Sequence, residues 1–365
     1  MAHLTSTTIP QGYSLFQSDL DEVLDLLSQE WEPLSNTNIF LTGGTGFFGI
    51  WIIESILWAN QNRNCQINLT VLTRSKNDFL EKKAPHLKDH PNLHFIEGSA
   101  SNFVIPEATT GKTFDYIIHA ASENNIAASP LWPEKHYREA IEGTQRLIEM
   151  AKSHQSKAIL ITSSGAVYLP IDGTDAEGRG VEGPHGLNDF SSEKIVYGQS
   201  KRMMEVITSV AAKTNHFQAL IARCFAFLGP YLPIDSNYAA GNFIRDALLQ
   251  KQIVVSGDGT PLRSYMYPVD LVVWLLKILV SGQNAVPYNV GGDQMVSIGQ
   301  LAKLVSEVGK NAAGFEVRGV PKPNAKPSVY VPSLERVESE LNVKVTVDLE
   351  ESIYRTLKWH QVRGK

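Results

Sequence analysis

From residue 38 to about residue 225, short runs of β-branched and aliphatic residues alternate with amphipathic stretches of helical period. Strands that alternate with helices run parallel, because each crossover helix returns the chain to the same end of the sheet. We therefore predict an α/β fold with a doubly wound parallel sheet. The predicted strands are 38–43, 67–73, 93–98, 115–121, 158–164 and 217–225, and the helices between them include 47–60, 134–153 and 195–214.

A glycine-rich turn joins the first strand to the first of these helices. In IFLTGGTGFFGIW, Gly44, Gly46 and Gly49 satisfy G-x-G-x-x-G, and Gly43, Gly46 and Gly49 give G-x-x-G-x-x-G. Glycine permits the tight turn, the close approach of backbone to pyrophosphate and close helix–strand contact, while the helix N-terminus faces the phosphates. The flanking strand and helix make this more than an ordinary loop, and we expect a Rossmann-type dinucleotide site.

The end of the second strand bears on the choice of dinucleotide. The acidic residue that binds an NAD ribose would fall near Thr73 and is missing, whereas Arg74 and Lys76 stand close by. An arginine at this place can bind the 2′-phosphate of NADP. The alternative is a solvated basic loop. We expect NAD or NADP, with NADP favoured by Arg74.

Three regions follow from this pattern. Residues 37–225 form the predicted dinucleotide-binding domain. Before it, 1–36 is an extension in which leucines and valine at helical spacing predict one helix over 18–31, with Ser18 and Asp19 as candidate caps. After it, 226–365 is rich in Gly and Pro and predicts a smaller substrate-binding lobe, some of whose strands and helices can return to the first domain. Shorter helices are expected near 240–251, 268–281, 297–309 and 348–359, and surface loops at 168–190 and 318–332.

Charge and hydropathy exclude several classes of partner. The net charge is −5 and the pI about 6.1, so nothing indicates nucleic-acid binding. The longest aliphatic run, 271–280, is interrupted by Lys277 and is too short to span a bilayer. The N-terminus lacks the pattern of an export signal. Cys65 and Cys224 have no metal-like spacing. We expect a cytoplasmic protein without a membrane segment or a metal.

Tyr197 and Lys201 are the first candidates for chemistry. They are four residues apart in VYGQSKRMMEV, so on a helix both side chains point to one face. Free tyrosine is a poor base at neutral pH because its pKa is near 10. A neighbouring ammonium, together with an oxidised nicotinamide, favours the phenolate. The alternative is a surface helix with a partly buried tyrosine.

Several motifs occur in an order typical of one superfamily. The glycine turn, IIHAAS (117–122), IEGTQRL (141–147), a hydroxyl-rich strand end and the Tyr197/Lys201 pair together resemble the extended short-chain dehydrogenase/reductases, over about residues 37–360. In the second lobe, GNFIRDAL (241–248) and VVSGDGTPLRSYMYPVDLV (254–272) resemble the nucleotide-sugar epimerase, dehydratase and decarboxylase branch.

The resemblance implies roles for particular residues. In similar proteins the catalytic Ser or Thr lies four residues before the tyrosine of VY, here Tyr168, which implies Ser164 beside Tyr197 and Lys201. Thr162 and Ser163 are then expected to satisfy local backbone groups. Substrate-binding residues implied in the same way are Ser164, Phe225, Asn242 and Arg263, the last two holding the nucleotide diphosphate. Cofactor-binding residues implied are Gly43, Thr45, Gly46, Phe47, Phe48, Gly49, Arg74, Ser99, Ala100, Ala120, Ala121, Tyr197 and Lys201.

Two departures from the family pattern matter. The loop after the third strand has Ser99 and Ala100 where similar proteins carry an Asp for the adenine amine. Ser164 is followed by Gly165 and Ala166, where 4,6-dehydratases carry an acid–base pair and related decarboxylases a Glu. Neither residue can transfer a proton.

The expected reaction is therefore 4-epimerisation of a nucleotide-diphosphate sugar through a transient 4-ketosugar, because it needs no such pair. Dehydratase, decarboxylase and 4-ketosugar reductase activities remain alternatives. A loop acid could supply the missing group, the candidates being Asp172, Asp175, Glu177 and Glu182.

A dinucleotide-sensing protein without turnover is the alternative of another class, although it would need neither Ser164 nor Tyr197/Lys201. The resemblance also implies a homodimer that pairs through the helix bearing Tyr197 and the one before it, 134–153.

Overall fold

The computed structural model describes residues 7–108, 113–121, 132–168, 193–235, 238–323 and 327–363. Its centre is a seven-stranded sheet in the order β3-β2-β1-β4-β5-β6-β9, in which every neighbouring pair is parallel. The predicted doubly wound parallel sheet is confirmed. The strands are β1 Asn38–Thr42, β2 Asn68–Thr73, β3 Leu93–Glu97, β4 Tyr116–His119, β5 Ala158–Ser164, β6 Gln218–Cys224 and β9 Pro287–Val290.

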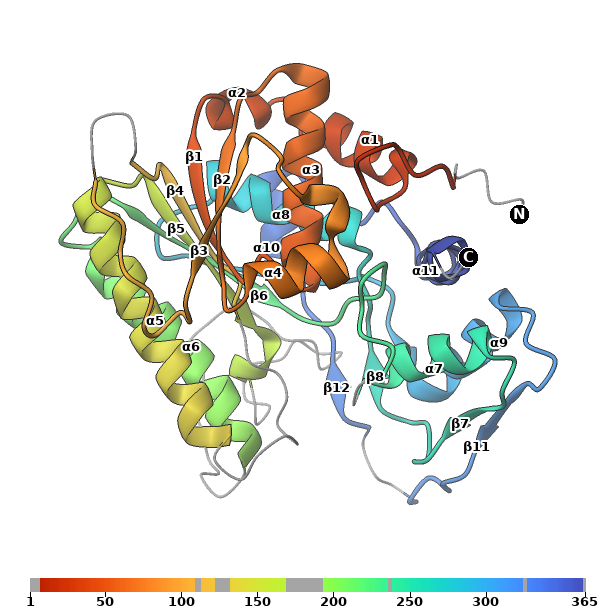
Figure 1. Ribbon diagram of the computed structural model, residues 1–365. Helices are drawn as coiled ribbons and strands as arrows, with labels where there is room; N and C mark the ends of the chain where they lie inside the picture. Colours follow the sequence, from red (N-terminus) through yellow and green to blue (C-terminus); the bar gives the residue numbers. More distant parts are fainter. Residues whose placement is uncertain are drawn as a thin grey trace.

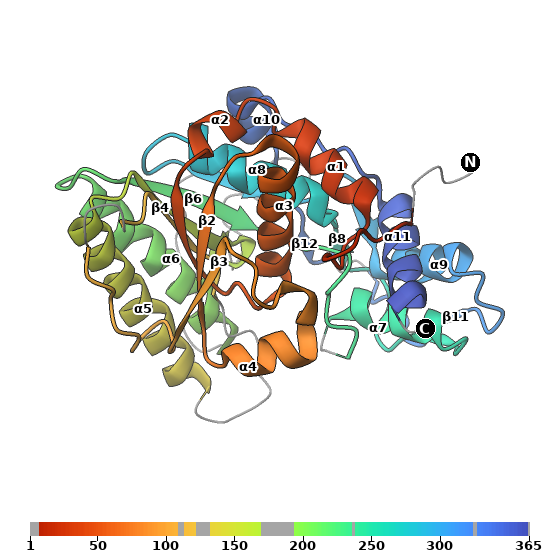
Figure 2. The same ribbon diagram turned by 45° about the horizontal axis from the view of Figure 1, so that its top comes forward.

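Helices cover both faces of this sheet. α5 (Trp132–His154) and α6 (Glu193–Ala212) lie side by side on one face, and α3 (Phe47–Arg63) and α8 (Pro268–Ser281) cover the other (Figures 1 and 2). Successive strand residues point to opposite faces, so Leu41 packs into the α3/α8 core while Phe40 packs into the α5/α6 core. The α8 helix is buried over most of its length because α1 covers its outer side.

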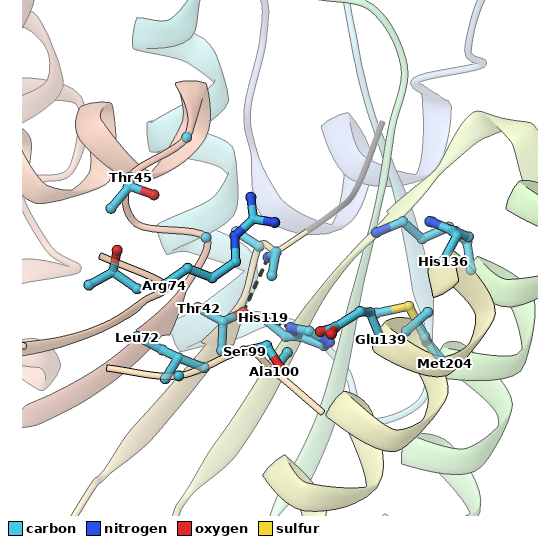
Figure 3. A pocket seen from close by; sticks show the side chains of 18 residues that line it. Thr42, Thr45, Leu72, Arg74, Ser99, Ala100, His119, His136, Glu139 and Met204 are labelled. Carbon is cyan, nitrogen blue, oxygen red and sulfur yellow. Dashed lines mark hydrogen bonds between the residues drawn. The ribbon is translucent and has the colours of Figure 1, made fainter. Parts of the chain in front are cut away.

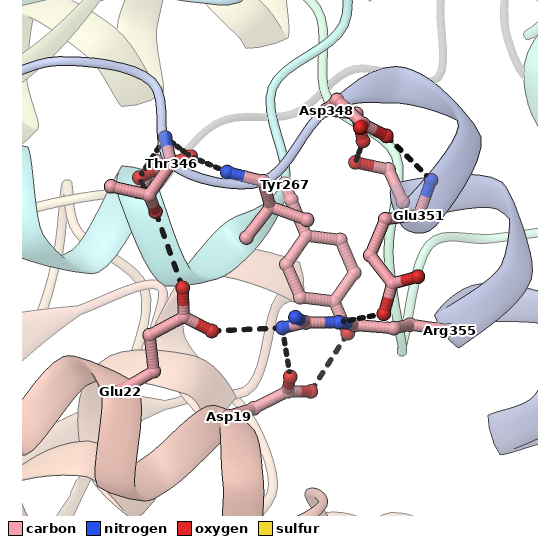
Figure 4. A network of polar contacts seen from close by, with 10 residues as sticks. Asp19, Glu22, Tyr267, Thr346, Asp348, Glu351 and Arg355 are labelled. Atoms are coloured by element: carbon pink, nitrogen blue, oxygen red, sulfur yellow. Dashed lines mark hydrogen bonds and ion pairs between the residues drawn. The ribbon is translucent and has the colours of Figure 1, made fainter. Parts of the chain in front are cut away.

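The N-terminal extension differs from the prediction of one helix over 18–31. It forms two helices, α1 (Gln17–Leu26) and α2 (Trp31–Leu34). The cap assignment is wrong as well, because Phe16 is the N-cap of α1 and Asp19 is fully buried. The Asp19 carboxylate accepts hydrogen bonds from the Tyr267 hydroxyl at 2.7 Å and from Arg355 at 2.7 Å (Figure 4). The extension is thereby joined to the C-terminal helix.

The smaller lobe has its own core, built between α7 (Ala239–Leu248), α9 (Ile298–Val308) and α11 (Leu349–Arg363). Two small sheets edge it, one of β7 (Ile253–Val255) and β11 (Phe315–Val317), the other of β8 (Leu262–Arg263), β10 (Val296–Ser297) and β12 (Val329–Tyr330). Although they follow residue 226 in sequence, α8 and β9 belong to the first domain. Short elements are α4 (Lys76–Asp78), α10 (Glu335–Leu341) and helical turns at Phe79–Lys83, Pro85–Leu87 and Gly165–Tyr168.

One predicted surface loop is wrong in part. Residues 318–332 include strand β12, and Val331 after it is buried. Most of the other predicted loop, at 169–190, lies outside the described residues, as do the four acidic side chains considered there. None of the described helices is both long and apolar enough to cross a bilayer.

Candidate active site

A pocket of about 320 Å³ opens at the carboxyl ends of β1 and β4, where the strand order reverses (Figure 3). In open parallel sheets this reversal leaves a crevice between diverging loops, which is where ligands bind. Nine of the residues implied for cofactor binding line its wall, namely Gly43, Thr45, Gly46, Arg74, Ser99, Ala100, Ala120, Ala121 and Lys201.

The glycine turn is shaped by close backbone contacts. Gly43 has a φ of +72°, and a Cβ there would lie 2.5 Å from the carbonyl carbon of Ala120. A Cβ on Gly49 would lie 2.2 Å from the Cα of Gly44, so the glycine permits α3 to pack closely on the turn. Gly49 itself is not among the described residues of the pocket wall. The N-terminus of α3 follows directly, with its amide groups unpaired within the helix. These features fit a dinucleotide pyrophosphate.

Phe47 and Phe48, also implied for the cofactor, are not on the pocket wall among the described residues. Both are half-buried, and the Phe48 ring contacts Phe227 edge-on with centroids 4.9 Å apart. Their side chains therefore pack against the hydrophobic core, and only their position in the first turn of α3 relates them to the phosphate site.

Arg74 and Lys76 are placed differently. The Arg74 side chain extends across the pocket (Figure 3). Lys76 instead lies over the ring of Phe95, its Nζ 5.7 Å from the centroid, and its backbone amide donates to Glu97. Of these two cations, Arg74 is the one that a bound dinucleotide would meet.

Several pocket residues escaped the sequence analysis. Thr42 and His119 are paired at the ends of β1 and β4, with Thr42 Oγ1 2.7 Å from His119 Nδ1. Burial, with the nearby charge of Lys201, lowers the pKa of His119 to about 3, so the imidazole is neutral. Helical spacing is the signal that could have found the others. His136, Glu139 and Ala140 follow one face of α5, and Met204 lies one turn after Lys201 on α6.

Lys201 and Tyr197 share a face of α6 as predicted. The Lys201 Nζ lies 6.0 Å from the centroid of the Tyr197 ring and donates to the backbone oxygen of Thr162 at 2.9 Å. Burial lowers the pKa of the Lys201 ammonium to about 8. Tyr197 is half-exposed, and its ring packs on that of His136 with centroids 5.3 Å apart. It lies beside the pocket, not on its described wall.

Ser164 ends strand β5 and is buried. Its Oγ accepts a hydrogen bond from the Ala166 amide at 3.1 Å and lies 3.3 Å from the hydroxyl of Tyr330. Tyr330 comes from β12 of the smaller lobe, in the segment predicted to be a loop, so the sequence carried no signal for it. Burial raises the pKa of the Tyr330 phenol. The smaller lobe thus contributes a hydroxyl beside the implied catalytic serine.

The implied substrate residues divide into two groups. Phe225 packs on Tyr330 with ring centroids 4.9 Å apart, and the Arg263 guanidinium lies 5.8 Å from the Tyr330 centroid. These two and Ser164 therefore surround one tyrosine. Asn242 lies on α7, where its side-chain oxygen accepts from Arg245 at 3.1 Å.

A buried ion pair lies beside the end of β5, next to the residue that precedes Ser164. Arg223 donates to both carboxylate oxygens of Glu205, at 2.9 and 2.7 Å, and to the Tyr168 hydroxyl at 3.0 Å. Ser163 donates to the same carboxylate, which corrects the expectation that it satisfies a backbone group. Thr162 does satisfy one, because its hydroxyl donates to the His119 carbonyl at 3.0 Å. The end of β5 is therefore fixed on both sides of the chain.

Comparison with curated proteins finds relatives along most of the chain. UDP-glucuronic acid decarboxylase 6 of Arabidopsis thaliana is 27% identical over 325 residues, covering 87% of this chain and 87% of the relative. UDP-glucuronic acid decarboxylase 4 of the same plant is 25% identical over 315 residues, covering 86% of this chain. The match spans only 66% of the length of that second relative.

Solved structures share the fold at lower identity. A UDP-N-acetylglucosamine 4-epimerase from Methanobrevibacter ruminantium superposes with a TM-score of 0.73 at 19% identity, over 90% of this chain and 99% of the other. A dTDP-glucose 4,6-dehydratase from Bacillus anthracis, solved with NAD, gives a TM-score of 0.69 at 20% identity, over 89% and 97%. The profile of the "NAD dependent epimerase/dehydratase family" matches residues 39–291, which is more than half of the chain. The protein belongs to this family, and the resemblance drawn from its motifs is confirmed.

Proposed function

We propose that the protein is an NAD(P)-dependent enzyme that modifies a nucleotide-diphosphate sugar, and that its reaction is 4-epimerisation. Family membership and relatives named for nucleotide sugars support the first part. The Arg263 guanidinium lies over the ring of Tyr330, whose hydroxyl is near Ser164, and supports the first part physically because a guanidinium fork matches phosphate oxygens.

The chemistry assigned to this chain is a reversible proton transfer. Tyr197, as the phenolate, accepts the proton of the sugar 4-hydroxyl, and the buried Lys201 ammonium favours that phenolate. Ser164 shares a hydrogen bond with the same sugar oxygen. A bound NAD(P) would supply the acceptor, and then the donor, of the C4 hydride. Once the 4-ketosugar had presented its other face, Tyr197 would return the proton to the C4 oxygen, so the sugar would undergo no net oxidation.

The observation that carries the preference for epimerisation is the packing after Ser164. A Cβ at Gly165 would lie 2.7 Å from the Phe225 ring, so an acidic side chain at this position would have to displace that ring. Ala166 has no ionisable group, and α6 packs on its backbone at Gly198. The two positions that follow Ser164 therefore hold no ionisable group, which favours epimerisation over dehydration.

Decarboxylation is the second candidate, favoured by the curated relatives. Oxidation of a uronic acid at C4 gives a β-keto acid, which loses carbon dioxide without removal of a C5 proton. The missing pair at Gly165 and Ala166 is a weaker argument against this reaction than against dehydration.

Reduction of a ketosugar would consume NADPH, which suits Arg74. Turnover itself, as opposed to dinucleotide sensing, is supported by the retention of Ser164, Tyr197 and Lys201.

The proposed cofactor is NAD or NADP, with NADP favoured because Arg74 faces the pocket and no acidic residue ends β2. Titration of the purified protein with both dinucleotides tests this preference. Equal or tighter binding of NAD would remove the role assigned to Arg74.

We also propose a homodimer formed by α5 and α6. Met203, Val206 and Val210 are exposed on α6 at helical spacing, with exposed fractions of 44%, 48% and 58%, and Tyr137 is exposed on α5. An apolar stripe of this kind is typical of a covered surface. Sedimentation at micromolar concentration should give a dimer, and Val206→Glu should shift it to monomer. A wild-type monomer would contradict the proposal.

Mass spectrometry of the purified enzyme with UDP-, dTDP-, GDP- and CDP-sugars, including a uronic acid, tests the reaction itself. Epimerisation gives an isomer of unchanged mass that chromatography separates. Loss of carbon dioxide would establish the second candidate, and loss of water would overturn the preference for epimerisation over dehydration.

A further inference from the structure

The pocket contains a carboxylate that the proposed chemistry does not use. Among the described residues of its wall, Glu139 is the only acidic one. It lies at the end of the pocket formed by the loop after β3, where Ser99 and Ala100 stand in place of the expected acid. Figure 3 shows its carboxylate turned toward these two residues.

Close helix packing brings Glu139 to this loop. A Cβ at Gly143 would lie 2.8 Å from the Cβ of Ala100, so the glycine lets α5 approach the loop directly. Glu139 lies four residues earlier, on the same face of α5. Its side chain therefore spans the short remaining distance from the helix to the loop.

Ser101 then fixes the carboxylate. Its hydroxyl donates to Glu139 Oε1 at 2.8 Å, and its backbone amide donates to Oε2 at 3.4 Å. The Ser99 and Ser101 hydroxyl oxygens are 3.0 Å apart, which continues the chain of polar groups along the loop. A carboxylate only accepts hydrogen bonds, and each of its two oxygens can accept more than one. The arrangement presents a pre-positioned acceptor to the pocket.

The order of the strands indicates which part of a bound dinucleotide would contact the Glu139 carboxylate. The ribose-binding position lies at the end of β2, so the adenosine half extends toward β2 and β3. Leu72 and Ala100 supply apolar surface at this end. Adenine has an apolar face and one exocyclic amine that donates hydrogen bonds. We propose that Glu139 accepts a hydrogen bond from this amine and so replaces the acid that the loop after β3 lacks. This inference rests on the proposed NAD(P) binding.

Binding of the dinucleotide and of its hypoxanthine analogue, in which a carbonyl replaces the amine, tests the proposal by calorimetry without turnover. Wild type should bind the adenine form at least about tenfold more tightly, as expected for a hydrogen bond to a charged acceptor. Glu139→Gln offers the analogue an N–H donor, so the preference should fall to within about threefold of parity. Glu142→Gln, exposed on the same helix, is the matched control and should keep the wild-type preference.

Ser101→Ala is a second variant, which keeps the Glu139 side chain but removes the hydroxyl that holds its carboxylate. This variant should weaken binding of the adenine form only. If Glu139→Gln keeps the full preference, or weakens both ligands equally as a merely structural anchor of Ser101 would, the inference is overturned. If wild type binds neither the adenine form nor the hypoxanthine form, the proposed cofactor fails as well. If wild type binds the two forms with equal affinity, only the role of Glu139 is overturned.

Discussion

Lys201→Met should make the fold more stable at neutral pH while it removes activity. Lys201 is fully buried, and burial lowers the pKa of its ammonium from 10.5 to about 8. A pKa lowered to this extent corresponds to a cost of about 3 kcal/mol for holding the charge in the folded protein. Methionine has a similar length and no charge to desolvate.

The gain is reduced by one lost interaction. Lys201 donates to the Thr162 carbonyl at 2.9 Å, and losing this bond costs about 1 kcal/mol. The net effect expected at pH 7 is therefore an increase of roughly 2 kcal/mol in the free energy of unfolding. Groups arranged for chemistry often lower stability in this way.

The effect should depend on pH with a defined sign. Between about pH 8 and 10.5 the unfolded chain holds a proton on this lysine that the folded protein has lost, so wild type gains stability as pH rises through this window. The advantage of Lys201→Met should be full below pH 8, should shrink as pH rises above it, and should be gone before pH 10.5 is reached. Urea unfolding of both proteins at pH 7 and 10, with the same content of bound dinucleotide, measures the difference in the free energy of unfolding.

Lys213→Met, on an exposed lysine just after α6, is the control and should show no comparable gain. The reasoning is refuted if Lys201→Met is less stable than wild type at pH 7, or if its advantage does not change with pH. Either result would mean that the ammonium is solvated or paired more fully than the structure indicates.

Two further predictions concern turnover and substrate. Tyr197→Phe should reduce the rate by about 10²–10⁴-fold while leaving dinucleotide binding nearly intact, since only a hydroxyl is removed; a rate above about a tenth of wild type in the sugar assay would exclude Tyr197 as the base. Arg263→Ala should weaken binding of a bare nucleoside diphosphate by about 1.5–3 kcal/mol through lost charge-assisted hydrogen bonds. Calorimetry measures the second, and unchanged affinity would place Arg263 outside the substrate site.

The features that depend on local spacing could be read from the chain. Alternating strand and helix patterns predicted six of the seven strands of the central sheet, because burial on both faces demands continuous apolar runs. The glycine turn followed from its spacing, and the shared face of Tyr197 and Lys201 followed from helical geometry. In each case the residues that interact are close in sequence, so the period of one element was enough.

The features that depend on contacts between distant segments required the structure. Tyr330 reaches Ser164 across 166 positions, from a segment whose composition predicted only a loop. The seventh strand, β9, returns to the first sheet from within the second lobe, and Asp19 is buried against Arg355 near the other end of the chain. Glu139 meets the loop after β3 at the place where Gly143 lets α5 and that loop touch. Such pairings are set by how the crossovers pack, and a side chain's own neighbours in sequence carry no record of them.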